Sequence, residues 1–278
     1  MTREEARRQF AEIVAREEND LQLDRAALLI AAEEYPNLNI AEYLSRLDDF
    51  GEQARARDDC FADPLTRIMR ISNLLFDDLD FRGNAGNYYD ARNSFLNDVI
   101  DRRTGIPITL SVLMIEVARR IGLRLLGVGM PGHFLVKYVD DEQEIFADPF
   151  HGGRIVDEDR CRQLIEQMYD GRMPFSVSFL HAVSKKQILS RMLQNLKVIY
   201  AKANDHFKLL GLIERTLMIN PDSATEIRDR GTANFALRRY AEARRDFETY
   251  LLRQPEADDV AKIKTLLAQL RQRQAQLN

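Results

Sequence analysis

The sequence predicts an α+β protein that is mainly helical, with a small antiparallel sheet packed on a central buried helix and a helical repeat region toward the C-terminus. Apolar residues recur with helical spacing from Leu110 to Ile121. Short apolar and alternating stretches follow and end at Asp148. Farther along, Pro221 and Pro255 lie 255 − 221 = 34 residues apart within a helical pattern, a spacing typical of stacked helical repeats.

The composition limits the classes of protein to consider. The chain has 278 residues, a formal net charge of −4 and 45% hydrophobic residues, which is enough for one large or two ordinary domains. The mildly acidic charge does not predict a nucleic-acid partner. The two cysteines cannot make a disulfide framework, which favours a reducing compartment. The start is charged, unlike a signal peptide, and no apolar run approaches the ~18 residues of a membrane span. We expect a cytoplasmic protein without a membrane partner.

The N-terminal part is predicted to be a layer of helices. Thr2 and Glu5 form a capping box before an amphipathic run. Asn93 or Ser94 is expected to cap the last helix of this layer. The four helices that follow this first amphipathic helix are predicted at residues 23–35, 41–56, 64–79 and 94–103.

Between the last two of these helices lies the segment FRGNAGNYYDARN. Its two Gly and three Asn residues predict a tightly turned loop that Tyr88 and Tyr89 pack against the core. Two interpretations remain open. The loop is either purely structural or a wall of a cleft, in which case Asn84, Asn87 and Tyr88 present polar groups to a ligand.

The central helix is predicted to start at Pro107, because a missing N–H costs nothing in the first turn of a helix. Gly122 is suited to end it in a left-handed conformation. Short strands are predicted at residues 123–129, 133–139 and 145–148. A further helix is predicted at residues 157–169, with Asp157 as its N-cap.

This order of elements resembles the transglutaminase-like core, which has a cysteine-protease-like fold. In that family a Cys in a G-x-C context starts the buried helix, a His opens the next-but-one strand and an Asp closes the strand after it. The matching positions are His133 and Asp148. The resemblance implies that a thiolate at the helix start attacks, that the His takes its proton and that the Asp orients the ring.

The nucleophile of that family is missing, because Pro107 occupies the cysteine position. Thr109 lies in the next turn, but a hydroxyl needs far more activation than a thiol. Cys60 lies outside the motif, either as a small buried apolar residue or as a relocated thiol that enters the cleft. Cys161 is predicted to be inert.

His151 follows Asp148 by three residues and is assigned to the cleft. With His133 it would complete a set of zinc or iron ligands, but the irregular spacing argues against this. We predict no metal and no cofactor. We predict a contact between His133 and Asp148. Three roles for this pair remain open: it is catalytic, it holds two strands together, or it lines a binding groove. If His133 is a surface residue, the substitution His133→Ala should change the free energy of unfolding by no more than about 0.5 kcal/mol.

A narrower resemblance covers roughly residues 60–255. The stretches FRGNAGNYYDARNSFLNDVIDRRTGIPITL, PGHFLVKY and DPFHGG look like those of the bacterial SirB-type family. Its members are transglutaminase-like proteins with a C-terminal tetratricopeptide region. In the second repeat the small, aromatic and proline positions of that motif are filled by Gly231, Tyr240, Ala243, Phe247 and Pro255. A capping helix is predicted at residues 257–274.

We therefore divide the chain into a core domain at residues 1–180 and repeats at residues 181–278, and two functional hypotheses follow. In the first, which Pro107 favours, the protein is a non-catalytic module that binds a protein or peptide partner through its repeats. In the second, it is an amide- or peptide-bond hydrolase or acyl transferase that uses His133 and Asp148 with a displaced nucleophile.

Overall fold

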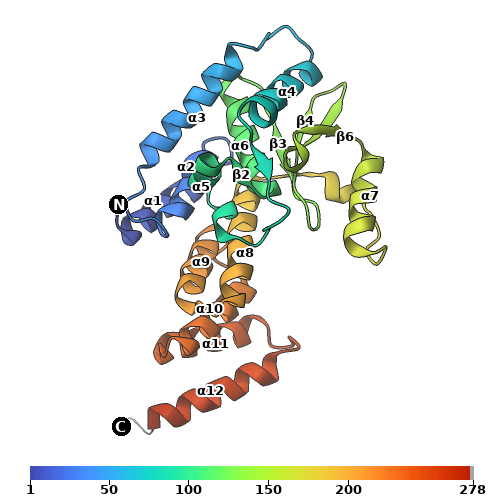
Figure 1. Cartoon of the computed structure of the whole chain (residues 1–278). Coiled ribbons are helices and arrows are strands. Elements are labelled where there is room, and N and C mark those ends of the chain that lie inside the picture. The colour runs from blue at the N-terminus through green and yellow to red at the C-terminus, as the bar shows by residue number, and fades with distance from the viewer. Residues whose placement is uncertain (276–278) are drawn as a thin grey trace. The chain divides into compact units, whose positions relative to one another are not determined.

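Figure 1 shows the computed structural model, which describes residues 1–275. The chain divides into two compact units, Met1–Met192 and a second one from Leu193 onward. The division lies within helix α8 (Lys185–Lys202), whereas the sequence-based boundary was placed at residues 180/181. Each unit has its own helices and core.

The first unit begins with four helices, and the first of them is capped by Thr2 as predicted. The Thr2 hydroxyl accepts the Glu5 amide at 3.2 Å, and the Asp63 carboxylate accepts the Thr66 amide at 2.9 Å. The helices are α1 (Arg3–Val14), α2 (Leu23–Ala32), α3 (Ile40–Arg55) and α4 (Pro64–Ser72). Two predicted ends change: α2 stops at Ala32, and α4 gives way to a π-helical turn over Asn73–Asp78. That turn buries three consecutive apolar residues, Leu74, Leu75 and Phe76.

The prediction that Asn93 or Ser94 caps the next helix is wrong. Both residues lie in a 3₁₀ turn, Ala91–Ser94, and helix α5 (Leu96–Arg102) starts after it with Phe95 at the cap position. The turn forms because the Asp90 carboxylate accepts the Arg92 amide at 3.0 Å. This leaves the Asn93 side chain free to hold the loop before it.

The central helix α6 (Pro107–Arg120) is confirmed, and every residue from Pro107 to Ala118 is buried. Gly122 ends it in the left-handed region, at φ +75°. The helix packs against strands β3 and β4 of the sheet. It is therefore one of the elements that hold the sheet in place, together with residues Cys161 and Ile165 farther along the chain.

The sheet is antiparallel, with five strands in the order β6-β5-β4-β3-β7. Their bounds are β3 (Leu126–Val128), β4 (Leu135–Val139), β5 (Glu144–Asp148), β6 (Arg154–Val156) and β7 (Ala182–Val183). The three predicted strands form its centre, and the two edge strands were missed because segments this short show no periodicity. His133 precedes β4 and lies in the turn before it.

Two further features of the first unit frame the sheet. Strand β1 (Arg82–Gly83) pairs in parallel with β2 (Thr104–Gly105), the segment that leads into α6. Helix α7 (Glu158–Tyr169) follows β6, and the Asp157 carboxylate accepts the Arg160 amide at 2.8 Å. The predicted N-cap of this helix is confirmed.

The second unit is helical and is continued from α8 by α9 (His206–Ile219), α10 (Ala224–Ala236), α11 (Tyr240–Arg253) and α12 (Val260–Ala275). Helices α10 and α11 pack closely at the predicted small and aromatic positions. A Cβ atom added at Gly231 would lie 2.7 Å from the Phe247 ring, and Ala243 and Phe247 are completely buried. This close approach explains the glycine of the repeat motif.

A buried charge cluster joins α6 to α2. The Glu116 carboxylate accepts hydrogen bonds from Arg119 at 2.8 Å and Arg120 at 3.0 Å, and the same two arginines donate to Asp24 at 3.2 and 2.9 Å. Glu116 is 1% exposed. Burial and the charge of Asp24 raise the pKa of Glu116 to about 7, although both arginines oppose the shift.

We expect the substitution Glu116→Gln to change how stability depends on pH. The Glu116 carboxyl keeps its proton to higher pH in the folded protein than in the unfolded chain. Its protonation therefore adds fully to the free energy of unfolding below pH ~4.5, and this contribution is lost as the pH rises through about 7. Relative to the variant, the wild type should therefore lose about 3 kcal/mol of unfolding free energy across that window. Urea titrations at several pH values measure it. The exposed residue Glu166 supplies a matched control, Glu166→Gln, and an equal pH profile in wild type and Glu116→Gln would refute the shift.

Candidate functional site

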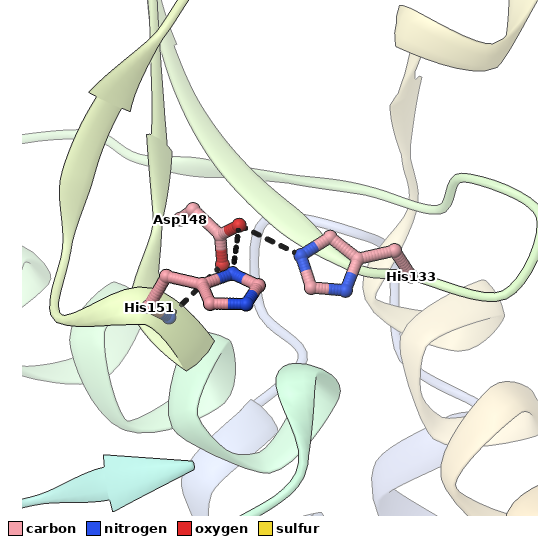
Figure 2. A group of neighbouring side chains, drawn as sticks. All are labelled: His133, Asp148 and His151. Carbon is pink, nitrogen blue, oxygen red and sulfur yellow. Dashed lines mark hydrogen bonds and ion pairs between the residues drawn. The ribbon is translucent and has the colours of Figure 1, made fainter. Parts of the chain in front are cut away.

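His133, Asp148 and His151 come together at the end of β5. Figure 2 shows both rings pointing at one carboxylate oxygen of Asp148. The distance from His133 Nε2 to Asp148 Oδ2 is 2.9 Å, and that from His151 Nδ1 to the same oxygen is 2.7 Å. The predicted contact between His133 and Asp148 is thus present in the structure. His151, which was assigned only to the cleft, is a direct partner of the same carboxylate.

The backbone around Asp148 orients this carboxylate. Asp148 is the last residue of β5 and the N-cap of the turn η3 (Pro149–His151). Its Oδ1 atom accepts the amides of Phe150 at 3.1 Å and His151 at 3.3 Å. The other oxygen is therefore left for the two imidazoles. This division fixes which oxygen faces the rings.

The turn before His133 places its ring. The His133 amide donates to the Met130 carbonyl at 3.2 Å, and Gly132 between them has φ +72°. The His133 side chain is 6% exposed and that of Asp148 is 2% exposed, whereas His151 is 48% exposed. His133 is therefore a buried residue, and the sequence-based assumption that it lies at the surface is wrong.

The electrostatics of the cluster favour an ionised carboxylate. Burial alone would raise the pKa of Asp148. The hydrogen bond and charge of His133, followed by those of His151, outweigh burial and hold that pKa below its ordinary value. Asp148 is therefore an anion that faces two imidazoles.

Neither Pro107 nor Thr109 offers a free nucleophile at the start of α6. Pro107 occupies the first turn and is buried. The Thr109 hydroxyl accepts the Ile106 amide at 3.1 Å and donates to the Asn93 carbonyl at 2.8 Å. It thus completes the cap of the helix, and its proton is already bound within the protein. Helix α6 packs against both β4 and η3, which places it beside the cluster.

Neither cysteine joins the cluster. Cys60 is exposed in the turn before α4, so the expectation of a small buried residue is wrong. Cys161 is completely buried in α7, and burial raises its pKa to about 11, which makes it a poor thiolate at neutral pH. Within residues 1–275, the group of close metal-ligating side chains at this site consists of His133, Asp148 and His151 alone.

The Asn-rich loop is held together by its own side chains. The Asn84 amide donates to the Asn93 side chain at 3.1 Å, and the Asn87 backbone amide donates to Asn84 Oδ1 at 3.0 Å. Asn93 in turn donates to the carbonyls of Asn87 at 2.8 Å and Tyr88 at 3.3 Å. The side chain of Asn84 and the backbone of Asn87 are therefore used inside the loop.

Phe150, which was not among the predicted site residues, connects this loop to the cluster. Its ring centroid lies 6.3 Å from that of Tyr88 and 6.1 Å from that of His133. A Cβ atom added at Gly83 would lie 2.5 Å from the Phe150 carbonyl oxygen, so the glycine permits close packing of β1 on η3. The aromatic residue between Asp148 and His151 was the available signal. The loop is thus structural and also adjoins the site.

Two arginines beside the cluster were also missed. A small cavity of about 60 Å³ is lined by Asp148, His151, Arg154, Val156 and Arg160. Arg154 follows the Gly-Gly turn and Arg160 lies in the first turn of α7, so no sequence spacing would have brought them together. The cavity combines positive side chains with an exposed imidazole.

A buried helix, an antiparallel sheet and a His–Asp contact next to that helix define a protein of the transglutaminase-like class. The family model described as "Transglutaminase-like superfamily" matches residues 41–194, and the chain belongs to this family. A tetratricopeptide repeat model matches residues 196–268. Among residues 1–275, no helix combines the length and apolarity needed to cross a membrane.

Several named proteins are similar to the chain. A UPF0162 protein of Xylella fastidiosa (strain 9a5c) is 35% identical over 257 residues, which cover 91% of this chain and 92% of the relative. A UPF0162 protein of Pseudomonas aeruginosa is 30% identical over 209 residues, or 73% of this chain and 74% of the relative. F-box only protein 21 of Mus musculus is 35% identical over 134 residues, 45% of this chain and 20% of the relative. The narrower likeness to the SirB-type family stays a prediction.

Proposed function

We propose that this protein is a non-catalytic module of the cytoplasm, with a transglutaminase-like core that lacks the family's nucleophile and repeats that bind a protein or peptide. The observation that supports it is Pro107 in the first turn of α6, where the resemblance places the cysteine. The neighbouring Thr109 hydroxyl is bound within the helix cap. His133 and Asp148 remain, but a base and its orienting group do not make an acyl-transfer site alone.

The second unit supplies a groove suited to a peptide. A cavity of about 300 Å³ is lined by residues of α8, α9 and α10, among them Val198, Leu209 and Ile213. At its edge the Lys197 ammonium is paired with Glu226 at 2.6 Å. The His206 Nδ1 atom is buried and has no hydrogen-bond partner among the residues described here, which leaves it available to a ligand. An apolar groove with a few polar groups is typical of peptide sites.

Binding can be tested with the full chain on an immobilised library of 15-residue peptides. Val198 lines the groove and is 37% exposed, so Val198→Asp should leave the fold intact and weaken binding to the selected peptides about 10-fold or more. The control is Leu252→Asp, since Leu252 is 84% exposed on α11 and does not line the groove. Equal losses in the two variants, or no selected peptides, would refute peptide binding by the groove.

The alternative function is hydrolysis or transfer at an amide bond with a displaced nucleophile, and the 2.9 Å contact between His133 and Asp148 is what favours it. No thiol or hydroxyl in residues 1–275 hydrogen-bonds to the His133 ring. A screen of amide and peptide substrates decides between the two proposals. Turnover that His133→Ala abolishes would establish the enzyme and contradict the non-catalytic module.

A further inference from the structure

We propose that His133, Asp148 and His151 bind one divalent transition-metal ion, most favourably Zn²⁺. This inference goes beyond the peptide-binding function and does not depend on it. The three ligand atoms all lie within 4.8 Å of one another. They come from the turn before β4, the end of β5 and the turn η3, so the fold brings together residues that are irregularly spaced in the sequence.

The distances already approach those of a coordination sphere. Two ligands bound to zinc at about 2.0–2.1 Å in a tetrahedral arrangement are about 3.3 Å apart. His133 Nε2 and His151 Nδ1 lie 2.9 and 2.7 Å from Asp148 Oδ2. An ion therefore needs these two contacts to lengthen by about half an ångström. Rotation of the half-exposed His151 ring can lengthen the second contact. The first contact needs a small shift of the buried His133 or Asp148 side chain.

The surroundings orient the ligands as outer-shell groups do in known metal sites. Asp148 Oδ1 is held by the amides of Phe150 and His151, which leaves Oδ2 to face the ion. In the metal-bound state each imidazole carries its proton on the nitrogen opposite the ion, Nδ1 in His133 and Nε2 in His151. The ligating nitrogens are then neutral and have free lone pairs.

The donor set selects among metals. Two imidazoles and one carboxylate suit Zn²⁺ and Fe²⁺, whereas Mg²⁺ and Ca²⁺ prefer oxygen ligands throughout. Three protein ligands leave a coordination position open for water or for a ligand. The cavity of about 60 Å³ beside Asp148 and His151 provides space, and Arg154 and Arg160 there suit an anionic group on such a ligand.

The test is equilibrium dialysis of the full chain against ZnCl₂, with bound metal counted by mass spectrometry. The protein carries Cys60→Ser throughout, because an exposed thiol binds zinc by itself. We expect one zinc ion per chain, no Mg²⁺, and a Co²⁺-substituted form with visible absorption bands. His151→Ala should weaken zinc binding about 100-fold or more, since even the loss of an outer-shell partner costs 10–100-fold. The exposed position of His151 keeps this variant folded.

The matched control is His181→Ala, because His181 is exposed and outside the cluster. It should bind zinc as tightly as the wild type does. Asp148→Asn provides a second variant at the shared ligand and should weaken binding as His151→Ala does. A chain that binds no zinc would overturn the proposal, and so would an equal loss in His151→Ala and His181→Ala. Because zinc is counted directly, failure here leaves the peptide-binding result unaffected.

Discussion

The substitution Asp148→Ala should lower the free energy of unfolding by about 3 kcal/mol or more, because removing one partner of a buried pair leaves the others unsatisfied. The carboxylate of Asp148 makes hydrogen bonds to the His133 and His151 rings and accepts hydrogen bonds from two backbone amides of η3. It is 2% exposed, so water cannot replace it. Urea or thermal unfolding measures the loss.

Asp157→Ala is a suitable control, since Asp157 also caps a helical turn but is exposed. Its loss should cost about 1 kcal/mol, the usual effect of removing a cap. Similar values for the two variants would mean that the histidine contacts of Asp148 contribute nothing. His133→Ala should fall between them at about 1–3 kcal/mol, as expected for a buried hydrogen-bonded group. This replaces the smaller effect expected for a surface residue.

The substitution Pro107→Cys should create a thiol that iodoacetamide alkylates at least about 10-fold faster than Cys60 or Cys161 at neutral pH, because a helix N-terminus lowers a thiol pKa. Position 107 is in the first turn of the 14-residue helix α6, which packs against η3 and β4. Proline is favoured in the first turn but not required there, so the variant should fold. Mass spectrometry of the alkylated peptides gives each rate.

The double variant Pro107→Cys with His133→Ala separates two causes of this reactivity. If the new thiol lies beside His133, as the resemblance implies, the rate falls when the imidazole is removed. An unchanged rate would mean that only the helix end activates the thiol. A thiol at position 107 that reacts no faster than Cys60 would mean either that the family's cysteine position is not Pro107 or that the cleft at this buried position is closed to iodoacetamide.

Local sequence signals were sufficient for the main elements of the fold. Helix α6 is buried along one continuous stretch, and its Pro107 start and Gly122 end were both readable. The caps at Asp157 and Thr2 depend on residues three positions away. Such features are set by interactions within one or two turns, so the amino-acid order defines them.

The sequence was a poorer guide to side chains whose partners lie in other segments of the chain. Asn93 was expected to cap a helix, but its amide holds the Asn87 and Tyr88 carbonyls. Cys60 was expected to be a small buried residue, but of the two cysteines only Cys161 is buried. A short polar or small side chain can have several local hydrogen-bond partners or degrees of burial, and the tertiary structure decides which of them it has.

The sequence by itself determined the fold class, the absence of a cysteine at the start of α6 and the His–Asp pair suggested by the resemblance. Only the tertiary structure decided that His151 joins His133 on the same oxygen of Asp148, that His133 is buried, and that Arg154 and Arg160 line the adjoining cavity. The physical reason is that this site is built from turns. The direction of a side chain in a turn depends on the hydrogen bonds of its neighbours, and it has no periodicity that a sequence can display.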